Sequence, residues 1–246
     1  MPREPIGRPG ASSSTFPGSW IPGEWRKGFT DTYSVTFDGV DEYVDLGTSS
    51  NLNPEDITIA MWIKPDALTN YDYLFTRGSA DYFEAYRFEI GATDLFCAFG
   101  NGSSNGWLSR AHGMSNGNWY HAAVTYDGAT AALYVDGAML GATESISIVM
   151  EQATRNSYIA KPLGTGAYFD GLIDEAAIWS RALSAVDITA IYNGGTPQSL
   201  ASYNPTGWWR MGDGDTFPTL QDWSSTGTSA GTMTNMESGD ITADTP

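Results

Sequence analysis

The chain has 246 residues, a length that suits one large β-sandwich with terminal segments. It carries 29 acidic and 12 basic residues, for a net charge of −17. Four of the basic residues lie in residues 1–27, so the rest of the chain is strongly acidic. An acidic body repels phosphate backbones, which argues against nucleic-acid binding.

Residues 1–31 alternate prolines with glycines, which disfavours regular structure and predicts an extended N-terminal arm. This segment has no apolar stretch typical of a secretory signal peptide. Large apolar side chains on an extended arm are stabilised when they are buried against another surface. We therefore predict assembly contacts at Phe16, Trp20, Trp25 and Phe29.

The residue pattern of 32–200 predicts a series of short strands. Apolar residues recur with a period of two over 57–63 and again over 120–126, and Asp127 with Gly128 marks a hairpin turn between two such runs. Cys97, the only cysteine, lies in one strand-like run, which predicts a buried, unreactive thiol. The pattern predicts an all-β antiparallel sandwich of the jelly-roll type.

One short helix is predicted near 184–193. Ser184 suits the N-cap, apolar residues follow at helical spacing, and Asn193 with two glycines after it favours termination. No run of about 18 apolar residues predicts a membrane-spanning helix, so we expect no membrane insertion. Residues 201–246 form a Trp- and Gly-rich C-terminal extension, for which we predict further assembly contacts at Trp208, Trp209 and Trp223.

Four segments together resemble the laminin-G-like, concanavalin A-like lectin/glucanase superfamily. They are, in chain order, 34–47 (SVTFDGVDEYVDLG), 57–65 (ITIAMWIKP), 119–128 with 133–137 (WYHAAVTYDG, LYVDG) and 169–184 (FDGLIDEAAIWSRALS). The resemblance implies a concanavalin A-like sandwich and says little about function, because this fold hosts lectins, adhesion modules, hydrolases and structural proteins.

The segment 207–214 (GWWRMGDG) is similar to the lead-in that precedes such a domain, although here it follows one. Tails of this kind resemble those of structural proteins of tailed bacteriophages. The resemblance implies a non-enzymatic virion structural or attachment protein, a capsid decoration or tail component, with other virion proteins or copies of itself as partners. It would be assembled in the host cytoplasm and located in the virion.

Two alternatives stay open. The first is a carbohydrate-binding lectin module on an extracellular surface or fibre, which would bind cell-surface glycan. Exposed aromatic residues beside polar loops are the side chains that such binding needs, and the candidates are Tyr71, Tyr73, Tyr82, Trp107 and Tyr168. The second and least favoured alternative is a glycoside hydrolase or lyase.

The hydrolase branch of the superfamily carries a Glu-x-Asp-x-x-Glu array on one strand face, and this array is absent. Asp174 and Glu175 are adjacent, so regular strand geometry predicts that they point to opposite faces. We therefore predict no catalytic residues.

Members of the superfamily also hold a structural Ca²⁺ between the opening and closing strands. The resemblance implies one such ion here, with Asp38, Gly39, Asp41 and Asp174 as the matching positions. Because Ca²⁺ takes about six to eight oxygen ligands, backbone carbonyls such as that of Gly39 would contribute.

Overall fold

The structure is a computed structural model that describes residues 29–246 except 70, 79–83 and 165. The chain divides into two units, Met1–Thr30 and Asp31–Pro246. The assembly contacts predicted at Phe16, Trp20 and Trp25 lie outside the described residues, and Phe29 belongs to the first unit.

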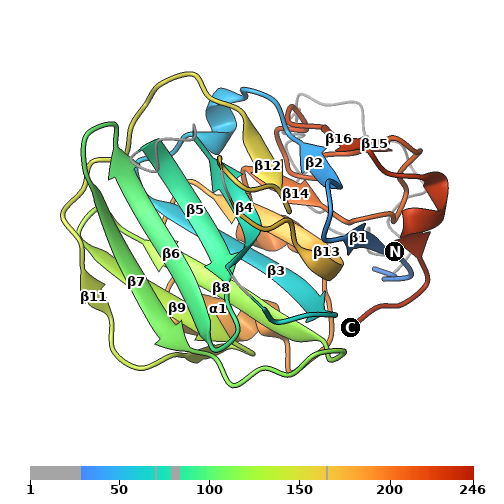
Figure 1. The fold of residues 1–246 in the computed structure, drawn as a ribbon, viewed down its shortest axis with the longest axis horizontal. Coiled ribbons are helices and arrows are strands. Elements are labelled where there is room, and N and C mark those ends of the chain that lie inside the picture. The colour runs from blue at the N-terminus through green and yellow to red at the C-terminus, as the bar shows by residue number, and fades with distance from the viewer. Residues whose placement is uncertain (1–28, 70, 79–83, 165) are drawn as a thin grey trace, which may run out of the picture. The chain divides into compact units, whose positions relative to one another are not determined.

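The second unit is a sandwich of two antiparallel sheets, which confirms the predicted fold class (Figure 1). In its described part, the first sheet has the order β10 (Ala138–Met139), β9 (Thr130–Val135), β8 (Tyr120–Tyr126), β3 (Ile57–Pro65), β13 (Asp170–Trp179), β1 (Ser34–Asp38) and β17 (Ile241–Thr242), with β11 (Glu144–Ser145) on β9 and β14 (Gly207–Trp209) on β13. The second sheet has the order β15 (Thr219–Leu220), β16 (Gly231–Thr234), β2 (Tyr43–Asp45), β12 (Ser157–Ile159), β4 (Asp72–Arg77), β5 (Glu84–Ile90), β6 (Asp94–Asn101) and β7 (Asn105–Ala111).

Local sequence signals account for the best-predicted elements. The β8–β9 hairpin turns at Asp127, whose Oδ1 accepts hydrogen bonds from the backbone N–H groups of Ala129 and Thr130. The helix α1 (Ala185–Tyr192) begins with a capping box between Ser184 and Asp187 and ends at Asn193 in a left-handed conformation. Three 3₁₀ turns, Ser50–Leu52, Ala201–Tyr203 and Ser238–Asp240, complete the helical content of the described residues. α1 has eight residues, and no helix in the described part is long and apolar enough to cross a membrane.

The core lies between the two sheets. Phe99 of β6 stacks on Tyr126 of β8 at 4.1 Å between ring centroids, and Phe75 of β4 meets Trp209 of β14 at 5.9 Å. Cys97 is fully buried among these residues, as the sequence predicted, and burial raises the pKa of its thiol.

Residues 201–246 are built into the sandwich. β14 pairs with β13, β17 pairs with β1, and β16 pairs with β2, beside which the red C-terminal segment lies in Figure 1. Trp209 is fully buried and Trp208 is 4% exposed, so the assembly role predicted for these two residues is wrong. The large apolar side chains of Trp208 and Trp209 therefore pack within this chain. Trp223 is 41% exposed and its assembly role stays a prediction.

Replacing Trp209 by Ala is expected to lower the free energy of unfolding by about 3–5 kcal/mol, because it removes a fully buried ring that bridges the two sheets. Denaturant unfolding measures this loss. The matched control is Trp223→Ala, which removes a partly exposed ring and is expected to cost about 1 kcal/mol or less. Equal losses in both variants would contradict the core role of the C-terminal segment.

Candidate functional site

A β-bulge in β13 brings together a group of carboxylates. β13 pairs with β3 along its length, but the register shifts between Asp174 and Ala177, and Glu175 has a φ of 47°. The extra residue breaks the alternation of side chains. Contrary to the prediction that adjacent residues point to opposite faces, Asp174 and Glu175 each bring a carboxylate oxygen to one site.

The bulge lies where one partner strand of β13 replaces another. β1 pairs with residues 170–173 of β13, and β14 pairs with residues 176–178. The chain leaving β14 and the chain entering β1 therefore meet opposite the bulge. Arg210 and Asp213 come from the first of these segments and Asp31 from the second.

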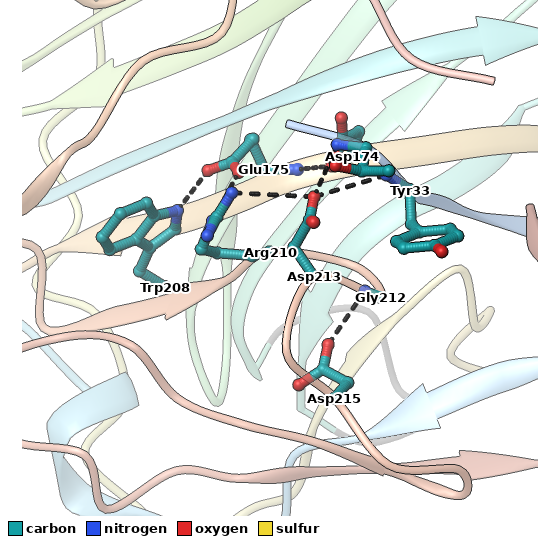
Figure 2. A network of polar contacts seen from close by, with 9 residues as sticks. Tyr33, Asp174, Glu175, Trp208, Arg210, Gly212, Asp213 and Asp215 are labelled. Atoms are coloured by element: carbon teal, nitrogen blue, oxygen red, sulfur yellow. Dashed lines mark hydrogen bonds and ion pairs between the residues drawn. The ribbon is translucent and has the colours of Figure 1, made fainter. Parts of the chain in front are cut away.

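We define the acidic cluster as Asp31, Asp174, Glu175 and Asp213 with Arg210. Figure 2 labels its members Asp174, Glu175, Asp213 and Arg210. Oxygens of Asp31, Asp174 and Glu175 all lie within 4.8 Å of one another. The Glu175 carboxylate accepts from Arg210 Nε at 3.0 Å and from the indole N–H of Trp208.

Asp213 ties the two chain segments together. Its Oδ2 accepts hydrogen bonds from the backbone N–H groups of Thr32 and Tyr33, and it lies 3.6 Å from Arg210 Nη2. Gly212, the residue before it, donates to Asp215 (Figure 2). The turn that carries Asp213 is thus fixed from both sides.

The cluster holds more carboxylates than its one cation can neutralise. Asp174 is fully buried and Glu175 is 3% exposed. Both oxygens of Asp31 and the Oδ2 of Asp174 lack a hydrogen-bond partner. Burial raises the pKa of Asp31 to about 6, and burial together with the Glu175 charge raises that of Asp174 well above its usual range. Burial also raises the pKa of Glu175 to about 8, although Arg210 opposes this effect. Such a group needs either bound protons or a bound cation.

The structure does not bring the predicted metal ligands together. Asp38 pairs with Asp170 in the β1–β13 register, four residues along β13 from Asp174. Its Oδ1 accepts from the backbone N–H groups of Val40 and Asp41, so Asp38 organises an exposed turn around Gly39. Of the predicted set, only Asp174 lies in the acidic cluster.

A second candidate site is the aromatic face, defined as Tyr71, Phe96 and Trp107 on the second sheet. Phe96 of β6 packs edge-on against Tyr71 at 5.6 Å between ring centroids and stacks with Trp107 of β7 at 6.0 Å. Tyr71 is 45% exposed and Trp107 is 59% exposed. Two of the predicted glycan-contacting residues are therefore neighbours on one surface, joined by Phe96.

A charged pair borders the aromatic face. The guanidinium of Arg87 lies 5.1 Å from the centre of the Phe96 ring, and its Nη1 is 3.2 Å from Glu89 Oε1. Glu89 is directly opposite Phe96 in the β5–β6 register and is 3% exposed. Burial raises the pKa of Glu89 to about 7, against the opposing charge of Arg87.

The other predicted glycan contacts lie elsewhere. Tyr73 is 3% exposed, and Tyr168 is half-buried and packs on Tyr43 at 6.3 Å. Tyr82 lies outside the described residues. Tyr73 and Tyr168 thus serve the packing of the sheet and its covering loop more than an open surface.

Sequence reasoning missed Asp31, Glu175 and Phe96. Asp31 was assigned to the arm, and Glu175 was assigned to the opposite face because a bulge is not visible in the residue pattern. Phe96 could have been found, because Leu95 and Cys97 on either side of it are core residues and strand alternation then places Phe96 on the outer face.

Comparison with known proteins agrees with this architecture. Residues 38–189 match the family model Laminin_G_3, described as the concanavalin A-like lectin/glucanases superfamily. The match spans more than half of the chain, which therefore belongs to this superfamily. No curated protein matched by sequence.

Among solved structures, the carbohydrate-binding module CBM40 of Ruminococcus gnavus IT-sialidase, bound to α2,3-sialyllactose, matches with a TM-score of 0.56 and 16% identity, over 68% of this chain and 100% of that module. A Bacteroides ovatus protein described as a putative carbohydrate-binding protein matches with a TM-score of 0.56 and 20% identity, over 89% of this chain and 58% of that one. A heptameric SAP-like pentraxin from Limulus polyphemus matches with a TM-score of 0.51 and 19% identity, over 68% of this chain and 85% of that one. At these identities the likeness establishes the shared fold.

Glu89 gives a pH-dependent prediction. Because its pKa is raised in the folded state, its contribution to stability is complete below about pH 4.5 and is lost as the pH rises through about 7. Glu89→Gln is expected to remove this loss, so the melting temperature of the variant should rise relative to that of the unmodified protein between pH 5 and pH 8. Thermal melts of both proteins across this range measure the difference. Parallel pH profiles would contradict a raised pKa at Glu89.

Proposed function

We propose that this chain is a non-catalytic carbohydrate-binding module that holds its ligand on the aromatic face. The observation that carries the proposal is the exposure of Tyr71 and Trp107 on either side of Phe96. Aromatic rings stack on the apolar faces of sugars, and nearby polar groups bind the hydroxyls. The carbohydrate-binding module CBM40 among the solved structures that share this fold supports the same function.

The alternatives have less support. A glycosidase needs two carboxylates that flank an accessible substrate, whereas Asp174 and Glu175 are buried. A virion role was implied by the resemblance of the C-terminal segment to tails of phage structural proteins. Two of the assembly contacts that it led us to expect, Trp208 and Trp209, are buried in the chain's own fold.

Trp107→Ala is expected to weaken glycan binding at least about tenfold, which corresponds to about 1.4 kcal/mol. Tyr71→Ala should act in the same direction. A printed glycan array identifies bound sugars, and titration calorimetry with the best of them measures the affinity of each variant. The matched control is Trp223→Ala, whose ring lies against Arg210 and outside the aromatic face. An array without bound glycans would refute the proposal.

We further propose that the acidic cluster holds one structural Ca²⁺. The oxygens that lack hydrogen-bond partners belong to Asp31 and Asp174, and carboxylate oxygens are the ligands that Ca²⁺ prefers. Glu175 would contribute less, since Arg210 and Trp208 already engage it. The ion would neutralise buried charge and link the segment before β1 to β13.

Adding Ca²⁺ to protein first treated with EDTA, at about 100 times the dissociation constant, is expected to raise the melting temperature by about 5 °C or more. Asp174→Asn should abolish this increase, because it removes a central ligand. Asp38→Asn is the control and should keep the increase, since Asp38 lies in a separate turn. A melting temperature that Ca²⁺ leaves unchanged would refute the proposed ion.

A further inference from the structure

The aromatic face is flanked by a cavity at each end. Beyond Tyr71, a cavity of about 170 Å³ is lined by Thr69 and by residues 91–94 of the β5–β6 turn. Beyond Trp107, a larger cavity of about 460 Å³ runs beside β7. We call it the edge groove, and it is lined by residues 105–110 and 144–148.

The aromatic face connects residues that line the two cavities, and we call this series of surfaces the path. Tyr71 lines the first cavity and packs on Phe96, and Trp107 stacks on Phe96 and lines the edge groove. Successive ring centroids are 5.6 and 6.0 Å apart, so the three rings form one unbroken row. A ligand that uses all of these surfaces must be extended and must cross β5–β7.

The edge groove is suited to hydroxyl-bearing ligands. Its lining includes Ser109 of β7 and Ser145 and Ser147 of the facing segment, and both of the latter are exposed. β7 is the last strand of its sheet in the described structure, so its outer edge borders the groove. Backbone N–H and C=O groups at a strand edge are available to polar partners.

The charges along the path indicate a neutral ligand. Arg87 lies 3.2 Å from Glu89, and Arg110, which lines the edge groove, lies 3.2 Å from Glu144. Each of these cations already has a carboxylate partner. The net charge of −17 further disfavours the approach of an anionic glycan.

We infer that this surface binds a neutral, linear oligosaccharide along several consecutive sugar units, with the edge groove as an additional subsite next to Trp107. The inference rests on the proposed glycan-binding function and specifies its ligand class. It distinguishes this chain from a module that recognises a charged terminal sugar.

The test measures binding of the full chain to a glycan array. The array carries neutral linear glucans, mannans, xylans and arabinans of two to six sugars, together with sialyllactose. For the series that binds best, calorimetry measures affinity against chain length. We expect affinity to rise about tenfold or more between two and four sugars. Ser147→Leu, which fills part of the edge groove, should flatten this rise. Ser225→Leu places the same side chain at another exposed serine and should leave the rise intact.

Each outcome is decisive. Preferential binding of sialyllactose, or affinity that does not depend on length, would overturn the inference and leave the proposed glycan-binding function standing. A rise with length that persists in Ser147→Leu would exclude the edge groove as a subsite. Absence of binding to every glycan would refute the proposed function itself.

Discussion

The rest of this fold depends on the bulge at Asp174 and Glu175 in β13. One edge of β13 pairs with β3 throughout, and the other edge must serve two strands that come from opposite ends of the sequence. The extra residue, held at a φ of 47°, marks the point where β1 ends its pairing and β14 begins. A left-handed backbone is costly for a residue with a side chain, and here it aligns the Glu175 carboxylate with Arg210 and Trp208. The bulge therefore costs local backbone strain, and it allows β1 and β14, from the two ends of the second unit, to pair with the same strand.

That junction explains why the sandwich extends beyond the family match. The matched residues end at 189, yet β14 and β16 pair with β13 and β2 inside the match, and β17 pairs with β1 at its start. Lys64 Nζ donates a hydrogen bond to the Asp244 carboxylate at 2.7 Å, and the indole N–H of Trp119 donates to the same carboxylate at 3.0 Å. A chain cut after residue 200 would lose Trp209 from the core and would expose residues 176–178 on the edge of β13 that β14 covers. The C-terminal segment is thus a structural requirement of this sandwich.

The parts of the fold that the sequence predicted are those fixed by short-range chemistry. Ser184 with Asp187 defines the start of α1, and Asp127 defines the β8–β9 turn, because each acts on backbone groups within three residues. The acidic cluster was not predictable in this way. It needs Asp31, Asp174 and Arg210, which lie far apart in the sequence, to meet. It also needs a bulge that breaks the alternation rule on which the prediction relied. The aromatic face was predictable only in part. Strand alternation alone orients Phe96, whereas the packing of Phe96 against Tyr71 depends on a loop.

The two candidate sites differ in location and in the effect that a bound ligand would have. Tyr71, Phe96 and Trp107 hold one another in place on the outer side of one sheet, so a ligand would meet rings that are already ordered, and little conformational entropy would be lost on binding. The acidic cluster lies at the other sheet, within the junction of β13, β1 and β14, where Asp174 and Glu175 are buried. A cation there would act on the stability of the framework and not on the ligand surface. The same sandwich can therefore carry a stabilising ion and a recognition face without either one contacting the other.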